Sequence, residues 1–175
     1  MLRDLPIVQQ RRASFLLRSS LAHRLDLQEA APACLAKVAP KDLCGWEVKA
    51  GSQAIYCSGG RVDWIYLENC GLASLHASIG NLTALTRLDL SSNLLTSLPA
   101  SIGGLTALTT AVLKNNGLVL LPDSIGDLTA LQGLGLSSNG LTSLPTSIGK
   151  LRGLKELDVR DNYLGSLPDT IGDSA

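Results

Sequence analysis

The chain has 175 residues, of which 45% are hydrophobic and only 3% aromatic, and its formal net charge is zero. This length is typical of one domain with an aliphatic core, and the neutral charge gives no general argument for a nucleic-acid partner. The charges are nevertheless distributed unevenly along the chain. Residues 1–61 carry nine Lys and Arg against five Asp and Glu, whereas residues 62–175 carry six against ten. No apolar run approaches the roughly 20 residues that a membrane-spanning helix needs.

Residues 1–30 are predicted to form a basic amphipathic leader, either helical or disordered. Arginines alternate with serines and leucines there, and Asp4 is the only acidic residue before Asp26. Such a start is compatible with an organelle transit peptide, and the simpler alternative is a basic surface helix or a frayed tail. The segment lacks the apolar stretch of about 7–15 residues that marks a secretory signal. The start does not decide the compartment: a cytoplasmic location is slightly favoured, with a secreted or cell-surface location and an organelle as the alternatives.

The four cysteines leave the compartment open. They are Cys34, Cys44, Cys57 and Cys70. Their spacing contains no C-x-x-C and no nearby pair of histidines, so a zinc site is not expected. Four thiols can form disulfides in a secreted protein or stay reduced in the cytosol.

From Val62 onward the sequence repeats every 23 residues. The five units are 62–84, 85–107, 108–130, 131–153 and 154–175. Apolar residues at positions 1, 4 and 6 of each unit are typical of a short strand, whereas Pro and Gly in the second half exclude a long helix. One unit cannot bury its own leucines, so the units must stack, and about three are needed for stability.

The strand-and-turn part of each unit follows one pattern. The segments "LTRLDLSSNLL", "LQGLGLSSNGL" and "LKELDVRDNYL" match L-x-x-L-x-L-x-x-N/C-x-L, "VDWIYLENCGL" has Cys70 at the Asn position, and "LTTAVLKNNGL" departs only at Ala111. Residues 62–175 therefore resemble the leucine-rich repeat superfamily, and "SLPxSIGxL" is most similar to the Ras-group and Scribble-type repeats of intracellular scaffolds. The resemblance implies an α/β solenoid, a right-handed superhelix with a parallel concave sheet and a short 3₁₀ or irregular convex side.

The recurring polar residues are predicted to be framework. The resemblance implies that the Asn side chains, with Cys70 in the first unit, bond to the backbone beside each strand. The repeated glycines are expected where the backbone needs a positive φ or a close approach. They are Gly80, Gly103, Gly126, Gly149 and Gly172. The serines two residues before them are expected to cap the short convex turn. They are Ser78, Ser101, Ser124 and Ser147.

An open stack needs caps at its ends, and residues 31–61 are predicted to be the amino-terminal one. The order Cys44, Trp46, Val48, Cys57 and "GRV" resembles the cap of plant-type repeat proteins. That resemblance implies a Cys44–Cys57 disulfide, although the two cysteines are further apart than in that cap; the alternative is two small buried thiols. At the other end Ser174 interrupts the last leucine column, which indicates either a polar final turn or part of a longer array.

The residues that vary between units are predicted to bind a partner. Strand alternation directs positions 3, 5 and 7 onto the concave face. The predicted binding residues are Trp64, Tyr66, Glu68, Arg87, Asp89, Thr110, Val112, Lys114, Gly133, Gly135, Glu156, Asp158 and Arg160. Trp, Tyr and Arg are the residue types that dominate binding hot spots. The alternative is that Trp64 and Tyr66 only pack on the cap, and that Gly133 and Gly135 carry no function.

The sequence predicts a binding module with no enzymatic activity, cofactor or metal. His23 and His76 lack a defined nucleophile, no phosphate-binding glycine motif follows a strand, and Asp89 and Asp158 are expected about 14 Å apart, too far for a glycosidase pair. The predicted function is a protein–protein interaction or scaffold module in signalling, with a protein or peptide partner and an open oligomeric state. The alternatives are an extracellular recognition domain of plant or algal receptor type, a regulatory segment of a larger kinase or GTPase, and a structural fragment without a partner.

Overall fold

The computed structural model describes residues 46–47, 53–58 and 61–174. The predicted leader, most of the predicted cap, and the side chains of Cys34, Cys44 and Cys57 lie outside this description, so the proposed Cys44–Cys57 disulfide stays a prediction.

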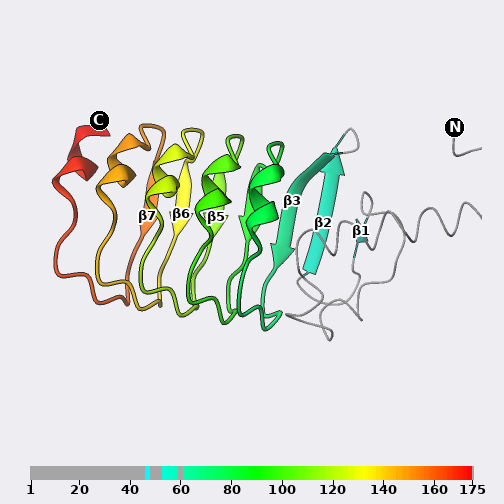
Figure 1. Ribbon diagram of the computed structural model, residues 1–175, viewed down its shortest axis with the longest axis horizontal. Helices are drawn as coiled ribbons and strands as arrows, with labels where there is room; N and C mark the ends of the chain where they lie inside the picture. Colours follow the sequence, from blue (N-terminus) through cyan, green and yellow to red (C-terminus); the bar gives the residue numbers. More distant parts are fainter. Residues whose placement is uncertain (1–45, 48–52, 59–60, 175) are drawn as a thin grey trace, which may run out of the picture.

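The described residues form one sheet of seven strands that follow one another in chain order (Figure 1). The strands are β1 (Trp46–Glu47), β2 (Gln53–Ser58), β3 (Arg61–Leu67), β4 (Arg87–Asp89), β5 (Thr110–Val112), β6 (Gly133–Gly135) and β7 (Glu156–Asp158). β1, β2 and β3 pair antiparallel, whereas β3 to β7 pair parallel, one strand for each repeat. The sheet therefore begins with an antiparallel hairpin and continues as the predicted solenoid.

A 3₁₀ helix follows each strand of the parallel part. These helices are η1 (Ala77–Asn81), η2 (Ala100–Gly104), η3 (Asp123–Asp127), η4 (Thr146–Lys150) and η5 (Asp169–Ser174). Pro99, Pro122 and Pro145 hold an extended conformation directly before η2, η3 and η4, so each helix starts one residue after the proline. The helices form a second row beside the strands, and η5 lies at the end opposite the β2–β3 hairpin (Figure 1).

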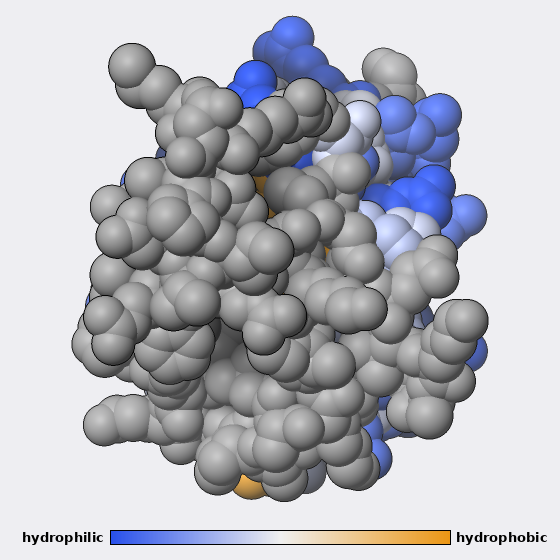
Figure 2. Space-filling view, turned by 90° about the vertical axis from the view of Figure 1, so that its right-hand side faces the viewer, coloured by the Kyte–Doolittle hydropathy of each residue, from blue (hydrophilic) through white to orange (hydrophobic). Residues whose placement is uncertain are grey.

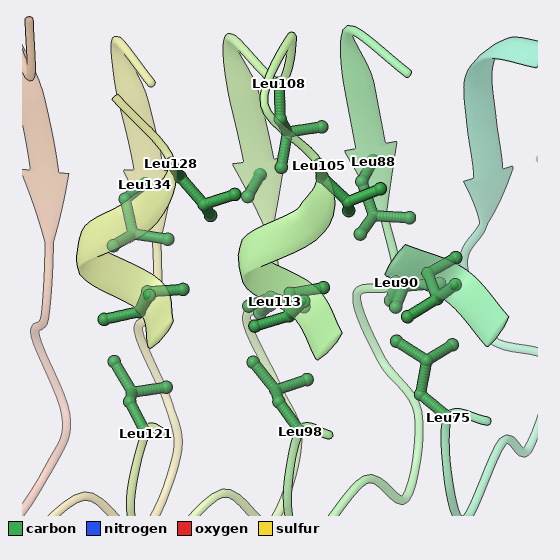
Figure 3. Packing of buried hydrophobic residues seen from close by; sticks show 14 of the residues in the cluster. Leu75, Leu88, Leu90, Leu98, Leu105, Leu108, Leu113, Leu121, Leu128 and Leu134 are labelled. Atoms are coloured by element: carbon green, nitrogen blue, oxygen red, sulfur yellow. The ribbon is translucent and has the colours of Figure 1, made fainter. Parts of the chain in front are cut away.

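Aliphatic side chains fill the layer between the strands and the 3₁₀ helices. Leucines from successive repeats point into this layer, as Figure 3 shows for Leu88, Leu105 and Leu128. The first-position leucines Leu85, Leu108 and Leu131 have no exposed surface at all. Burying one leucine contributes about 1.5–3 kcal/mol, so the predicted leucine columns are what holds the repeats together. In the last repeat the equivalent residue, Leu154, is only partly buried.

An asparagine ladder satisfies the backbone groups in the turns. The buried Asn93 side chain accepts hydrogen bonds from the backbone N–H groups of Cys70 and Leu72, both at 3.0 Å. Its amide group donates to the carbonyls of Leu67, Leu90 and Ser91 at 2.8–3.1 Å. The equivalent residues Asn116, Asn139 and Asn162 repeat this geometry, which confirms the framework role predicted for the column.

Cys70 occupies the position of an asparagine in the first repeat. Its backbone N–H donates a hydrogen bond to the side chain of Asn93, so Cys70 takes part in the ladder through its main chain. Its side chain, however, is disulfide-bonded, and the partner lies outside the residues whose side chains are described. The first repeat is therefore tied covalently where the later repeats use an asparagine.

The repeated glycines allow neighbouring 3₁₀ helices to approach each other. A Cβ atom added to Gly103 would lie 2.7 Å from the carbonyl oxygen of Ser124, and one added to Gly126 would lie 2.7 Å from the Cβ atom of Ser147. Real Cβ atoms essentially never make contacts this short. Neither glycine has a positive φ, so close approach is the reason for the column.

The prediction that serines cap the convex turns is wrong for η2, η3 and η4. Prolines occupy the N-cap positions, so Ser101, Ser124 and Ser147 fall on the second residue of each helix. Their hydroxyl oxygens are buried and have no hydrogen-bond partner among the described residues. In η1 the capping group is instead His76, whose ring nitrogen accepts a hydrogen bond from the N–H of Ser78.

Candidate functional site

The predicted binding residues lie on one surface, which we call the sheet face and define as positions 3, 5 and 7 of the repeats. Position 3 forms the row Trp64, Arg87, Thr110, Gly133 and Glu156. Position 5 forms the row Tyr66, Asp89, Val112, Gly135 and Asp158. The residues between the two rows, such as Leu88 and Leu134, are buried, which confirms the predicted alternation of the strands.

Position 7 extends the sheet face unevenly. Lys114 and Arg160 are exposed, whereas Glu68 is half-buried and accepts a hydrogen bond of 2.7 Å from the hydroxyl of Tyr66. Ser91, at the same position of the second repeat, is almost fully buried. Positions 3 and 5 therefore form the main part of the surface available to a partner.

An aromatic and cationic cluster stands at the amino-terminal end of the sheet face. The rings of Tyr56 and Trp64 are stacked with centroids 5.0 Å apart and an interplanar angle of 29°. The guanidinium of Arg87 lies 5.2 Å from the centroid of the Trp64 ring on its neighbouring strand. Trp64 is thus held between two neighbours in a fixed orientation and stays half-exposed.

Tyr56 was not predicted from the sequence. It comes from β2, which pairs antiparallel with β3 and places Tyr56 directly opposite Trp64. The two glycines Gly59 and Gly60 between these strands are a turn signal that favours a hairpin. Counting outward from that turn in regular register would place Tyr56 opposite Asp63, and a register shift between Tyr56 and Cys57 brings Tyr56 opposite Trp64 instead.

Beside the cluster the sheet face is hollowed. The hollow has a volume of about 210 Å³ and is lined by Trp64, Tyr66, Arg87, Leu88, Asp89, Thr110 and Val112. Six of these seven residues were predicted to bind, and the seventh, Leu88, forms the buried floor. The hollow combines aromatic, aliphatic and charged groups, as expected where a side chain of a partner is received.

Arg87 keeps its hydrogen-bonding groups available. It is exposed, and among the described residues its guanidinium makes the contact with Trp64 but no hydrogen bond or ion pair. The nearest acid along its strand, Asp89, accepts hydrogen bonds from the N–H of Ser91 at 2.9 Å and from the Ser91 hydroxyl at 2.6 Å. Ser91 therefore engages one oxygen, Oδ1, of the carboxylate that stands next to the arginine.

Gly133 and Gly135 leave β6 bare, as predicted. A Cβ atom on Gly133 would meet only Thr110, at 3.8 Å, and the nearest atom to a Cβ on Gly135 is a methyl carbon of Val112, at 3.7 Å. These are ordinary contacts, so the glycines are not required by the packing of the repeats. Because the two glycines have no side chains, the sheet face is open next to Val112.

The carboxyl-terminal end of the sheet face carries charges of both signs. Asp158 and Arg160 form a forked ion pair with N–O distances of 2.8 and 2.9 Å. The hydrogen bonds from the Arg160 side chain hold the pKa of the Asp158 carboxyl well below its ordinary value, and the same bonds raise the pKa of Arg160. Glu156 is exposed and has no such pairing among the described residues.

The pair makes a testable prediction about pH. Because the pKa of Asp158 is lowered on folding, the pair stabilises the native state above the ordinary carboxyl pKa of about 3.9, and this contribution is lost as the pH falls toward the lowered value. NMR titration of the Asp158 carboxyl carbon should show a midpoint well below 3.9, and Arg160→Gln should move it upward. An unchanged midpoint in the variant would show that Arg160 is not the cause.

The described part of the chain holds no group of three or more His, Cys, Asp or Glu side chains placed to bind a metal ion. Nor does it hold a helix long and apolar enough to cross a membrane.

Two segments of the chain match family models for leucine-rich repeats, residues 61–118 and residues 153–174. Comparison with curated protein sequences found no match. The two family-model matches point to the leucine-rich repeat family.

Solved structures give the same result over more of the chain. A leucine-rich repeat protein of Leptospira interrogans is 42% identical with a TM-score of 0.57, over 58% of this chain and 26% of its own length. A chain of the BIR3–SERK2 complex from Arabidopsis thaliana is 26% identical with a TM-score of 0.67, and the match covers 84% of both chains. The BIR2 ectodomain from the same plant is 25% identical with a TM-score of 0.65, over 78% of this chain and 76% of its own. With the 23-residue period and the parallel strands joined by 3₁₀ helices, these matches identify the chain as a leucine-rich repeat protein.

Proposed function

We propose that the chain is a protein-binding module that holds a protein or peptide partner on its sheet face. The observation that carries the proposal is the ordered cluster of Tyr56, Trp64 and Arg87 at the edge of the hollow. Trp, Tyr and Arg supply most of the energy in protein interfaces, and a ring held in place by its neighbours loses little conformational entropy on binding.

The shape of the molecule supports the same proposal. Stacked repeats form a rigid surface, because each repeat is fixed by the leucines and the asparagine of its neighbours. The residues on that surface differ from strand to strand, whereas the framework is constant. A rigid face with variable side chains recognises one partner without changing its own conformation.

Capture of a partner from an extract tests the proposal. The triple variant Trp64→Ala, Arg87→Ala, Asp158→Ala is expected to lose at least about tenfold in affinity for the captured partner, since the loss of hot-spot residues typically costs more than 1–2 kcal/mol. A matched control is the triple variant Thr106→Ala, Asp123→Ala, Thr146→Ala, whose exposed side chains belong to the returns between strands. Equal capture by the wild type and the sheet-face variant would contradict the proposal.

Two settings are compatible with such a module, and two observations favour the extracellular one. The "SLPxSIGxL" unit is similar to repeats of intracellular signalling scaffolds, which is the setting we propose first. The disulfide of Cys70 and the likeness to the BIR2 ectodomain favour instead a recognition domain of plant or algal receptor type.

Counting free thiols separates the two settings. The protein is unfolded without a reductant in the presence of a thiol-alkylating reagent, and the alkylated cysteines are counted. The extracellular setting predicts that no more than two of the four cysteines are alkylated, because the Cys70 disulfide consumes two. Four reactive thiols would contradict the extracellular setting and favour the intracellular scaffold setting.

A further inference from the structure

Opposite charges frame the bare part of the sheet face. Along position 3, Arg87 on β4 and Glu156 on β7 are both exposed, and Thr110 and Gly133 lie between them. Both charged side chains lack a hydrogen-bonding or ionic partner among the described residues, unlike Asp158 and Arg160, which neutralise each other. The row therefore presents a positive end, an uncharged middle and a negative end.

The uncharged middle is apolar and open. Val112 and Thr110 supply methyl groups on one side, and the missing side chains of Gly133 and Gly135 supply space on the other. A large apolar side chain placed there would contact the side chains of β5 and the bare backbone of β6. It would also cover that backbone, and glycine in a strand often marks a site where a ligand or another backbone approaches closely.

The spacing of the charges fits one extended peptide. Three strand spacings separate β4 from β7, which is about 14 Å at 4.8 Å per strand. An extended chain advances about 3.4 Å per residue and directs every second side chain to the same side, so residues i and i+4 lie about 14 Å apart on one face, with i+2 midway. Residue i+2 of such a chain lies between β5 and β6, above the open apolar middle.

The width of the surface also favours an extended chain over a helix. Positions 3 and 5 of one strand are about 7 Å apart, which accommodates a single strand-like segment. A helix with its side chains is about 10–12 Å in diameter and bridges over the glycine gap rather than filling it.

We infer that the sheet face recognises an extended peptide segment with an acidic residue, a large apolar residue and a basic residue at positions i, i+2 and i+4. This inference rests on the proposed protein-binding function and names the chemistry of the partner. The acidic group pairs with the guanidinium of Arg87, which offers a planar fork to a carboxylate, and the basic group pairs with Glu156. The peptide crosses the strands in either chain direction, so basic–apolar–acidic order is equally suitable.

Three labelled peptides test the inference by fluorescence anisotropy on the full chain. They carry ETFTK, ETFTE or KTFTK between Gly-Ser and Ser-Gly ends. Wild-type protein is expected to bind the ETFTK peptide about tenfold more tightly than either of the other two, since each of these places one like charge against Arg87 or Glu156.

Charge reversal in the protein should exchange the preferences. Arg87→Glu is expected to prefer KTFTK, and Glu156→Lys is expected to prefer ETFTE, each by a similar factor. Arg152→Glu changes an exposed charge to the same extent in a turn away from positions 3 and 5, and should keep the wild-type preference for ETFTK. Gained binding of a matched peptide also shows that a variant is folded.

Two outcomes would overturn the inference. One is that none of the three peptides binds at millimolar concentration, and the other is that the order of the three peptides is the same for wild type, Arg87→Glu and Glu156→Lys. Either outcome leaves the proposed protein-binding function standing if the sheet-face triple variant still fails to capture the partner. Capture that is insensitive to the triple variant removes both.

Discussion

Gly126→Ala is expected to destabilise the folded chain by about 2–3 kcal/mol, although it adds only one methyl group. The new Cβ atom would lie 2.7 Å from the Cβ atom of Ser147 and 2.9 Å from its carbonyl carbon, and backbone atoms cannot rotate away as a flexible side chain can. Overpacking of this kind typically costs about 1–3 kcal/mol. The stack must therefore open locally between η3 and η4, which also disturbs the leucines beneath them.

Gly133→Ala is the matched control for this experiment. The same methyl group on β6 would meet Thr110 at an ordinary 3.8 Å, and alanine is less costly than glycine in a strand. Its free energy of unfolding in urea should stay within about 0.5 kcal/mol of the wild type. Equal stability of Gly126→Ala and Gly133→Ala would contradict the close approach of the 3₁₀ helices.

Asn93→Ala is expected to cost about 3–5 kcal/mol, the largest effect of a single side chain outside the leucine columns. It removes five hydrogen bonds and leaves the N–H groups of Cys70 and Leu72 buried without a partner. Each buried polar group left without a hydrogen bond costs about 1–3 kcal/mol. The total stays below the sum over all these groups, because local opening of the turn lets water bond to some of them.

Urea unfolding and amide hydrogen exchange together check this second prediction. The free energy of unfolding should fall, and the amides of Cys70 and Leu72 should exchange much faster than those of the strands further along the stack. Asn81→Ala is the control, because Asn81 is exposed at the end of η1. A stability loss in Asn93→Ala no greater than in Asn81→Ala would show that the ladder does not stabilise the turns.

Much of the fold was predictable because the same apolar and polar positions recur in every repeat. The alternation at positions 1, 4 and 6 fixed which side chains face the core, and the register between strands confirms it. The sheet-face rows follow from the same alternation, so Trp64, Arg87 and Gly133 were placed correctly in one row. Whether these residues bind a partner remains a proposal.

The wrong predictions concern positions where a shift of one residue along the chain changes the role of a side chain, or where the role depends on a residue distant in the sequence. Serine caps were expected because Ser precedes a turn, but Pro122 and its equivalents take the N-cap position and shift Ser124 inside the helix. The positive backbone angles fall instead on the residue before the asparagine, such as Ser92 and Ser138 with φ of 56° and 55°. The same column holds Asn69, Asn115 and Asp161, residue types that adopt a positive φ more readily than most.

The beginning of the sheet shows a different limit. The resemblance to a cap placed a structural segment before Val62, but did not indicate that β2 pairs antiparallel with β3 and adds Tyr56 to the cluster around Trp64. Seen from this end of the stack, the described residues along one side are largely hydrophilic (Figure 2). The aromatic pair belongs to the sheet, because Tyr56 and Trp64 lie opposite each other on the paired strands β2 and β3.

The central claim is that partners are held on the sheet face, and footprinting of the captured complex tests it most directly. Hydroxyl-radical oxidation of Trp64, Tyr66 and Val112 should fall in the complex, whereas oxidation of the exposed Tyr163 and Leu167, which lie outside positions 3, 5 and 7, should stay the same. Protection confined to Tyr163 and Leu167, with Trp64 and Tyr66 oxidised as in the free chain, would contradict the account.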